Sequence, residues 1–405
     1  MKKRGTMRLA PLMAGVLLLA ACSNTGASLS PGATPSAPAS SASDAGSPSA
    51  PASATTHDLS QVPPAPDFSG AITADGATFP QPVYEQWLQS YNRDYPQIKV
   101  SYAGGGSGQG IKDITANTVQ FAGSDAPMKA DEKQAAESRN GTPILHIPAL
   151  FGAIVVAYNL PGVEKLNFSP DVIGKVFTGK ITNWNDPVIK ADNPNASLPD
   201  QQITVVHRSD GSGTTNAFTS WLCEVSSDWK DTLGANSCAG KEVKWPVGLG
   251  GKGNPGVTAQ VTQTAGAIGY IELAYALQNK VPYGNVKNAS GSFVEPTLDS
   301  VAAAANFEQI PADLTFEAWG SSVADAYPIT TATWLLVYQQ QEKVSSDQAR
   351  SAAVVHVLIW ALDKGGDDAK SLSYAVLPDR LREAALARIA TITWNGTPMV
   401  DELYR

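Results

Sequence analysis

Apolar and polar positions from residue 68 onward alternate between short β-branched runs and stretches with helical spacing. Apolar side chains recur every three or four residues over 80–95, which predicts a helix, and the run over 98–103 predicts a strand. Continued alternation indicates an α/β architecture. Further strands are predicted over 120–123, 153–158, 203–207, 267–271 and 330–338. Further helices are predicted over 111–119, 170–177, 214–225, 257–262, 349–363 and 380–392.

The length of the chain leaves material for two packed α/β lobes. It has 405 residues, and no repeat of 20 to 50 residues is visible, which excludes solenoids and propellers. The crevice between two lobes is the expected place for a small ligand.

Residues 1–21 have the pattern of an export signal. The basic start MKKRGTMR precedes an apolar run over 9–20 that is too short for a permanent membrane span. The ending Leu19-Ala20-Ala21-Cys22 resembles a bacterial lipobox, so we expect Cys22 to carry lipid and to anchor the protein to the outer face of the bacterial cell membrane. A plain secretory signal with a chance cysteine is the alternative.

Residues 22–67 have the composition of a linker. Ser, Ala, Pro, Gly and Thr dominate, the only large aliphatic side chains are Leu29, Leu59 and Val62, and aromatic residues are absent before Phe68. Such a segment cannot bury a core, and we expect it to be a disordered leash with a mean reach of roughly 35 Å.

The charge balance argues against a nucleic-acid partner. The chain carries 29 basic and 37 acidic side chains, and its net charge is −8. Four basic residues lie in the first 21 positions, so the rest is more acidic still. An anion would have to be bound by local donors against an adverse field.

Two cysteines remain after Cys22, namely Cys223 and Cys238. In an oxidising compartment we interpret them as one disulfide. A metal or redox pair is the rival interpretation, although the chain has no Cys-x-x-Cys motif and no histidine between the two cysteines.

Several glycine- and serine-rich loops follow a strand and precede a helix. The richest is 205–215, which contains Arg208-Ser209-Asp210-Gly211-Ser212, and similar loops occur at 76–80, 101–111 and 121–127. Glycines let an anion approach the unpaired N–H groups of a helix N-terminus, and an arginine fork suits two phosphate oxygens. Taken singly, each loop is also explained as an ordinary N-cap or turn.

Two carboxylates stand out in this setting. Asp210 lies two residues from Arg208 and either holds that cation or caps the following helix. Asp125 can only accept hydrogen bonds when ionised, so in an oxyanion pocket it demands a ligand that carries a proton. Phosphate has one at neutral pH and sulfate has none. An N-cap or turn acid before Pro127 is the alternative for Asp125.

Known catalytic and metal-binding signatures are absent from the sequence. It has no Gly-x-x-x-x-Gly-Lys-Ser/Thr, His-Glu-x-x-His or Gly-x-Ser-x-Gly motif, and its four histidines are scattered. We therefore expect no metal, no cofactor and no catalytic residue.

The combined motifs resemble the phosphate-binding proteins of bacterial phosphate ABC transporters. The matching segments are 76–80, 104–111, 123–127, 181–187, 208–214, 245–248, 250–253 and 266–272. The resemblance implies a two-lobed type II periplasmic-binding-protein fold, with the ligand in the cleft between the lobes. It further implies that 68–151 and 328–405 form lobe 1 and that 152–327 form lobe 2.

The same resemblance implies a set of phosphate-binding residues. Asp125 would accept the phosphate proton and Asp210 would aim Arg208. The implied donors are the backbone N–H groups of Thr78, Phe79 and Gly213, together with Ser107, Arg208, Ser212 and Thr214. Asp75 stands where the family often has glycine, which could alter the first loop.

These observations lead to the hypothesis of a monomeric, membrane-tethered receptor that captures inorganic phosphate and delivers it to the permease subunits of an ABC importer. A receptor for sulfate or molybdate is one alternative. A secreted phosphatase with a serine nucleophile and His207 as its base is another.

Overall fold

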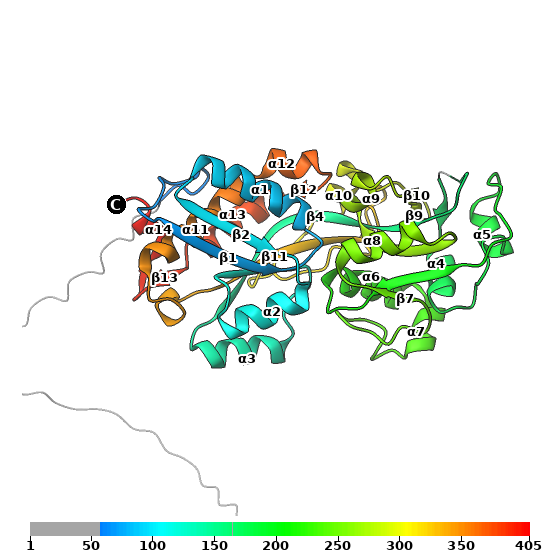
Figure 1. Cartoon of the computed structure of the whole chain (residues 1–405), viewed down its shortest axis with the longest axis horizontal. Coiled ribbons are helices and arrows are strands. Elements are labelled where there is room, and N and C mark those ends of the chain that lie inside the picture. Colours follow the sequence, from blue (N-terminus) through cyan, green and yellow to red (C-terminus); the bar gives the residue numbers. More distant parts are fainter. Residues whose placement is uncertain (1–56, 164) are drawn as a thin grey trace, which may run out of the picture. The chain divides into compact units, whose positions relative to one another are not determined.

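The computed structural model describes residues 57–163 and 165–405, which belong to one compact unit, Thr55–Arg405 (Figure 1). Its mixed helices and strands confirm the α/β class. The expected signal peptide, the lipidated Cys22 and the linker up to residue 56 lie outside the described residues. None of the described helices is both long and apolar enough to cross a bilayer.

A nine-stranded sheet runs through this unit in the order β2-β1-β3-β11-β4-β8-β6-β7, with β12 added beside β4. Its strands are β1 (Gly70–Gly76), β2 (Ile98–Ala103), β3 (Phe121–Ser124), β4 (Ile144–Tyr158), β6 (Thr204–Arg208), β7 (Leu249–Gly251), β8 (Ala267–Glu272), β11 (Thr330–Tyr338) and β12 (Ala375–Val376). A three-stranded sheet contains β5 (Asn167–Phe168), β9 (Asn285–Lys287) and β10 (Phe293–Val294). A two-stranded sheet contains β13 (Thr393–Trp394) and β14 (Thr397–Pro398).

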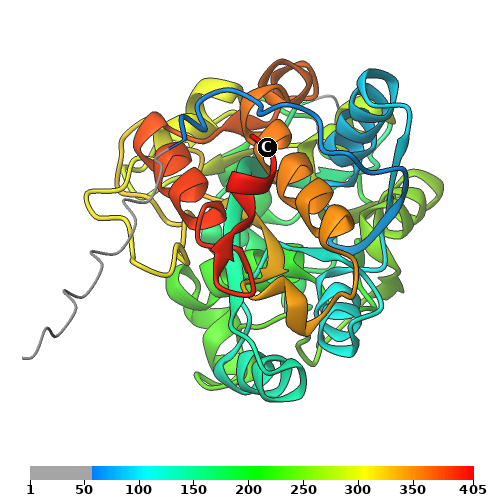
Figure 2. The same cartoon turned by 90° about the vertical axis from the view of Figure 1, so that its left-hand side faces the viewer.

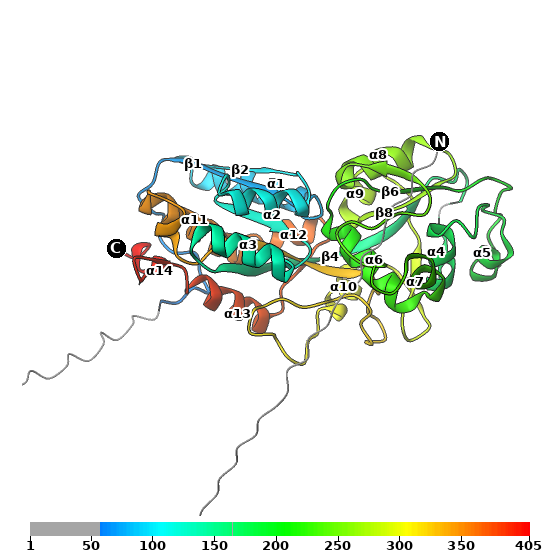
Figure 3. The ribbon, with the colours of Figure 1, turned by 90° about the horizontal axis from the view of Figure 1, so that it is seen from below.

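The helices pack around these strands in two groups, which Figures 1 and 3 show at either end of β4. One group contains α1 (Gln81–Asp94), α2 (Ser107–Ala116), α3 (Ala130–Asn140), α11 (Gln348–Asp363), α12 (Gly366–Ser371), α13 (Asp379–Ile389) and α14 (Met399–Glu402). The other contains α4 (Pro170–Phe177), α5 (Pro187–Asp192), α6 (Gly213–Val225), α7 (Ser227–Leu233), α8 (Gly253–Gln263) and α9 (Leu273–Gln278). Helix α10 (Leu298–Ala304) belongs to neither group and packs against β4 and β12. A 3₁₀ turn, η1, covers Gln341–Lys343.

Strand β4 joins the two halves of the sheet and is buried along its whole length. Residues 144–153 of β4 pair with β11, whereas residues 154–158 pair with β8. We call β2, β1, β3, β11 and their helices the first half, and β8, β6, β7 and their helices the second half. Within each half the strands that precede the glycine-rich loops are parallel, so their carboxyl ends meet at one edge.

The predicted elements all occur, but the sequence did not predict β1 or α3, and α2 and β4 begin earlier than predicted. Helix α2 begins at Ser107 rather than 111, because the glycines of its first turn are needed for close packing: a Cβ on Gly110 would lie 2.6 Å from the Gly76 Cα. Strand β4 begins at Ile144 rather than 153. Pro148 obscures the strand pattern, and the sheet accommodates it at a register shift opposite Thr333 and Trp334.

The last part of the predicted linker, 57–67, contacts the C-terminal helices (Figure 2). His57 stacks on Tyr404 and its Nε2 lies 2.9 Å from Asp401 Oδ1. Val62 N donates to Asp363 Oδ2 at 3.1 Å, and Leu59 is buried. Ordered packing therefore begins before Phe68, at two of the few aliphatic residues in the segment.

The structure joins Cys223 and Cys238 in a disulfide, which confirms that prediction. The bridge links the end of α6 to the loop after α7.

Candidate functional site

The glycine-rich loops singled out in the sequence lie close together between the first half and the second half of the molecule. Gly108 N donates to the Gly211 carbonyl oxygen at 2.8 Å, and Gly213 N donates to Ser107 Oγ at 3.0 Å. Gly213 is required here, because a Cβ at this position would lie 2.6 Å from the Asp125 Cβ. The loops after β2 and β3 thus contact the N-terminus of α6 across the two halves.

Arg208, at the end of β6, is buried and held by Asp210. Its Nε donates to Asp210 Oδ1 at 2.8 Å and its Nη2 to Oδ2 at 2.6 Å, which is a bidentate ion pair. Burial opposes ionisation of Asp210, but the hydrogen bonds and charge of Arg208 outweigh burial and hold the pKa of this carboxyl below its usual value. Asp210 therefore neutralises and orients Arg208, while Ser212 caps α6 by accepting from Thr215 N at 3.0 Å.

Asp125, directly after β3, is fully buried. Thr333 Oγ1 donates to its Oδ1 at 2.9 Å, and Ser107 Oγ lies 3.4 Å from its Oδ2. Burial raises the pKa of Asp125 to about 7, although these two hydrogen bonds and the charge of Arg208 act in the opposite direction. At neutral pH this carboxyl can therefore either hold or accept a proton.

The side chains of the predicted donor set are withdrawn from solvent. Thr78, Phe79, Ser107, Ser212 and Thr214 are each at most 2% exposed, and Arg208 is 4% exposed. Buried hydroxyl, amide and guanidinium groups of this kind need acceptors. The arrangement offers many donors, and its Asp125 is a buried carboxyl that is not paired with a cation.

Three further side chains reach this site and were missed by the sequence analysis. Asn254, in the first turn of α8, donates from Nδ2 to Thr78 Oγ1 at 3.1 Å and to Thr214 Oγ1 at 3.2 Å. Tyr275 donates to the Thr78 carbonyl oxygen at 2.6 Å, and Thr333 reaches Asp125. The loop over 250–253 repeats the strand, glycine and helix pattern and could have pointed to Asn254. The sequence carries no comparable signal for Tyr275 or Thr333.

A buried carboxyl, Glu272, lies behind the first loop. Tyr374 Oη is 2.7 Å from the Phe79 carbonyl oxygen and 2.8 Å from Glu272 Oε2, yet a phenol has one hydrogen to donate. A proton on Glu272 lets both contacts be hydrogen bonds, and burial indeed raises the pKa of Glu272 well above its usual value. Together Tyr275 and Tyr374 fix the carbonyl groups of Thr78 and Phe79 and thereby the backbone of this loop.

Asp75, at a position where the resemblance led us to expect glycine, accepts hydrogen bonds from two loops. Its Oδ1 accepts from Gly76 N at 2.5 Å and from Gly105 N at 2.7 Å. Burial raises the pKa of Asp75 against these hydrogen bonds, with a further contribution from Asp113. The carboxylate thus ties the loop after β1 to the loop after β2.

His207, the base of the phosphatase alternative, makes its contacts away from the serines of this site. His207 stacks on Trp245, and its Nδ1 lies 3.0 Å from the Arg208 carbonyl oxygen. Among residues 57–163 and 165–405 it makes no hydrogen bond with Ser107, Ser124 or Ser212, and no group of three or more His, Cys, Asp and Glu side chains could hold a metal ion.

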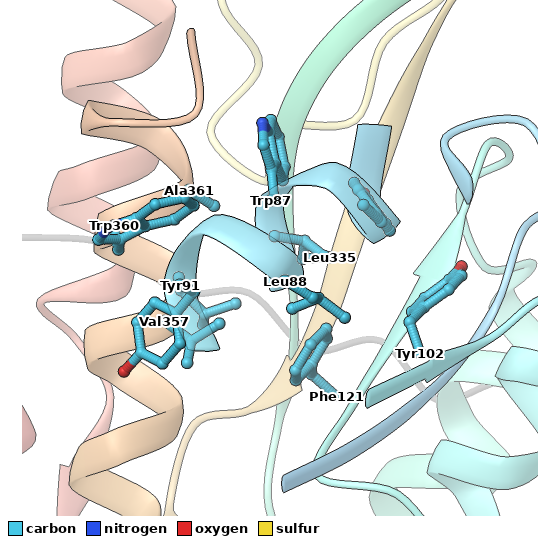
Figure 4. A pocket seen from close by; sticks show the side chains of 11 residues that line it. Trp87, Leu88, Tyr91, Tyr102, Phe121, Leu335, Val357, Trp360 and Ala361 are labelled. Carbon is cyan, nitrogen blue, oxygen red and sulfur yellow. The ribbon is translucent and has the colours of Figure 1, made fainter. Parts of the chain in front are cut away.

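A separate apolar pocket of about 20 Å³ lies between α1 and α11 (Figure 4). Its lining includes Trp87, Tyr91, Phe121, Leu335 and Trp360. This volume holds about one water molecule, and the apolar walls offer it no partners. The pocket is a packing defect of the core rather than a ligand site.

Comparison with known proteins identifies the family. A PBP superfamily domain matches residues 37–354. The phosphate-binding protein PstS of Pasteurella multocida is 40% identical over 334 residues, covering 79% of this chain and 90% of that protein. PstS of Methanocaldococcus jannaschii is 34% identical, covering 82% and 86%.

Solved structures agree on the fold. A high-affinity periplasmic phosphate-binding protein (PfluDING) bound with phosphate superposes with a TM-score of 0.63 at 21% identity, covering 78% of this chain and 93% of that chain. A phosphate-binding protein from Stenotrophomonas maltophilia gives 0.61 at 21% identity, covering 79% and 94%. The chain has the periplasmic-binding-protein fold and belongs to the PstS family of phosphate-binding proteins.

Proposed function

We propose that the protein is an extracytoplasmic receptor that binds inorganic phosphate between the two halves of the sheet and delivers it to an ABC importer. The observation that carries the proposal is the buried site itself, in which Arg208 and a set of N–H and O–H donors lie close to Asp125, a buried carboxyl that is not paired with a cation. The names of its PstS relatives agree with this ligand.

The donors in this proposal are Thr78, Phe79, Ser107, Arg208, Ser212, Gly213 and Thr214. Because Asp210 already neutralises Arg208, most of the attraction for the anion comes from hydrogen-bond dipoles rather than from net charge. Asp125 accepts the proton that HPO₄²⁻ carries, and a fully ionised oxyanion would oppose its carboxylate with a second acceptor.

We propose that the chain is divided into two lobes between residues 151 and 152 and between residues 327 and 328, and that the lobes close over the ligand. The register of β4 supports these boundaries, since its partner changes from β11 to β8 after Ala153. Donors lie on both sides of this division, so phosphate binds the closed form best and shifts the population toward it.

The remaining parts of the proposal concern segments and partners beyond the site. We propose that residues 1–21 are cleaved, that Cys22 is lipidated, and that the following segment tethers a monomeric receptor to the outer face of the membrane. The permease subunits of the importer then receive the phosphate.

Calorimetry of the globular part with phosphate tests the function directly. Arg208→Ala should weaken phosphate binding by about 2–5 kcal/mol, because it removes a desolvated charge and leaves Asp210 unpaired. Arg93→Ala, which removes an arginine 72% exposed in its pair with Asp94, is the matched control and should bind like wild type. If wild-type protein does not bind phosphate, the proposal fails.

The phosphatase alternative is disfavoured by the position of His207. Its ring stacks on Trp245, and burial lowers its pKa, which makes it a weaker base. Turnover of a generic phosphate ester that is lost in His207→Ala would support that alternative.

A further inference from the structure

Asn254 makes a set of contacts that reaches both halves of the molecule. Its side chain is fully buried at the N-terminus of α8. The two hydrogens of Nδ2 reach Thr78 Oγ1 in the first half and Thr214 Oγ1 in the second half. Its backbone N–H also donates to Thr78 Oγ1, at 3.0 Å.

The orientation of this amide is fixed by a third contact. Glu272 N donates to Asn254 Oδ1 at 2.9 Å. Because an N–H group cannot donate to an NH₂ group, Oδ1 must face Glu272 and Nδ2 must face the two threonines.

The hydrogen bonds from Asn254 fill acceptor positions on both threonine hydroxyls. A hydroxyl has one hydrogen and two acceptor positions. Thr78 Oγ1 accepts twice from Asn254, and Thr214 Oγ1 accepts from Asn254 and from Arg208 Nη1, the latter at 3.4 Å. Both hydroxyls therefore have only their hydrogen left to offer.

We propose that Asn254 is a positioning residue for phosphate recognition: its amide occupies the acceptor positions of Thr78 and Thr214 and so commits both hydroxyl hydrogens to the bound anion. The inference rests on the proposed function and deepens it. Since Thr78 and Asn254 belong to different halves, the first hydroxyl is committed only when the halves are together. Closure and donor direction are thereby coupled.

A double-mutant cycle on phosphate affinity tests this role. Asn254→Ala should weaken binding by about 10-fold to 100-fold in the wild-type background. In a Thr78→Val, Thr214→Val background, where no hydroxyl remains to be positioned, the same substitution should change the affinity by less than about 2-fold. Equal losses in both backgrounds would mean a general structural effect and would overturn the inference.

Two controls keep the outcomes separate. Asn193→Ala removes another buried asparagine, whose Nδ2 donates to the Asn167 and Ile189 carbonyl oxygens, and should lower the melting temperature without weakening phosphate binding. If Asn254→Ala does not fold, the nearly isosteric Asn254→Asp keeps the acceptor for Glu272 N and should weaken binding by more than about 10-fold. Unchanged affinity would overturn the inference. Failure of the wild-type protein to bind phosphate would instead refute the proposed function.

Discussion

Replacing Asp125 by Asn should stabilise the ligand-free protein at neutral and alkaline pH while it impairs phosphate binding. Burial raises the pKa of Asp125 from 3.8 to about 7 in the folded protein. Between these two values the folded state holds a proton that the unfolded state has released, so the folded state loses stability as the pH rises. Above pH 7 the full penalty for an ionised, buried carboxylate is present.

The size of this penalty follows from the two pKa values. Relative to a side chain that never ionises, Asp125 lowers the unfolding free energy by about 4 kcal/mol at pH 8. At pH 5, where the folded protein keeps the carboxyl protonated, the loss is less than half of that. An asparagine never ionises, and its Oδ1 can still accept the hydrogen bond from Thr333. The stability advantage of Asp125→Asn over wild type should therefore grow by about 3 kcal/mol between pH 5 and pH 8.

Urea unfolding at a series of pH values measures this difference. The samples must be free of phosphate, because a bound ligand stabilises the folded state of wild type and variant unequally. Asp231→Asn, at an exposed position of α7, is the matched control and should give no pH-dependent gain. A stability difference between Asp125→Asn and wild type that stays constant from pH 5 to pH 8 would refute the reasoning.

Two further predictions concern a disulfide and an ion pair outside the proposed phosphate site. Reducing the Cys223–Cys238 disulfide, or replacing both cysteines by serine, should lower the unfolding free energy by about 3 kcal/mol, because the bridge closes a loop of 15 residues. Denaturant titrations measure this loss, and an unchanged unfolding free energy in the reduced protein or in the variant would contradict the prediction. Glu132→Gln should weaken phosphate binding by about 2-fold to 10-fold in calorimetry, because Glu132 and the largely buried Lys241 form an ion pair at 2.5 Å that joins the two halves. The control Glu295→Gln, in the exposed pair with Lys165, should leave the affinity unchanged. If Glu132→Gln binds phosphate as tightly as wild type, the ion pair has no role in closure.

The sequence predicted those parts of the fold that depend on local pattern. Helix α4 and strands β2 and β11 have the predicted bounds, because apolar periodicity and flanking prolines act within each segment. The early start of α2 escaped prediction because its glycines are poor helix formers. Contacts with distant residues, such as Gly211 and Gly76, set its first turn instead.

The same distinction applies to the site. The pairing of Arg208 with Asp210 is a contact two residues apart, and the sequence left it as one of two interpretations. Thr333 lies 208 residues from Asp125, and Tyr275 lies 197 residues from Thr78. Only the pairing of β3 with β11 and the meeting of the two halves bring these residues together, so no pattern along the chain marks them.

Calorimetric titration of the wild-type globular part with phosphate and with sulfate at pH 8 tests the central claim most directly. Sulfate has the size and shape of HPO₄²⁻ but no proton for Asp125, and two buried acceptors in opposition cost about 3 kcal/mol or more. Phosphate should therefore bind at least about 100-fold more tightly than sulfate, and Asp125→Asn should reduce this preference. Comparable affinity for the two anions would contradict the account.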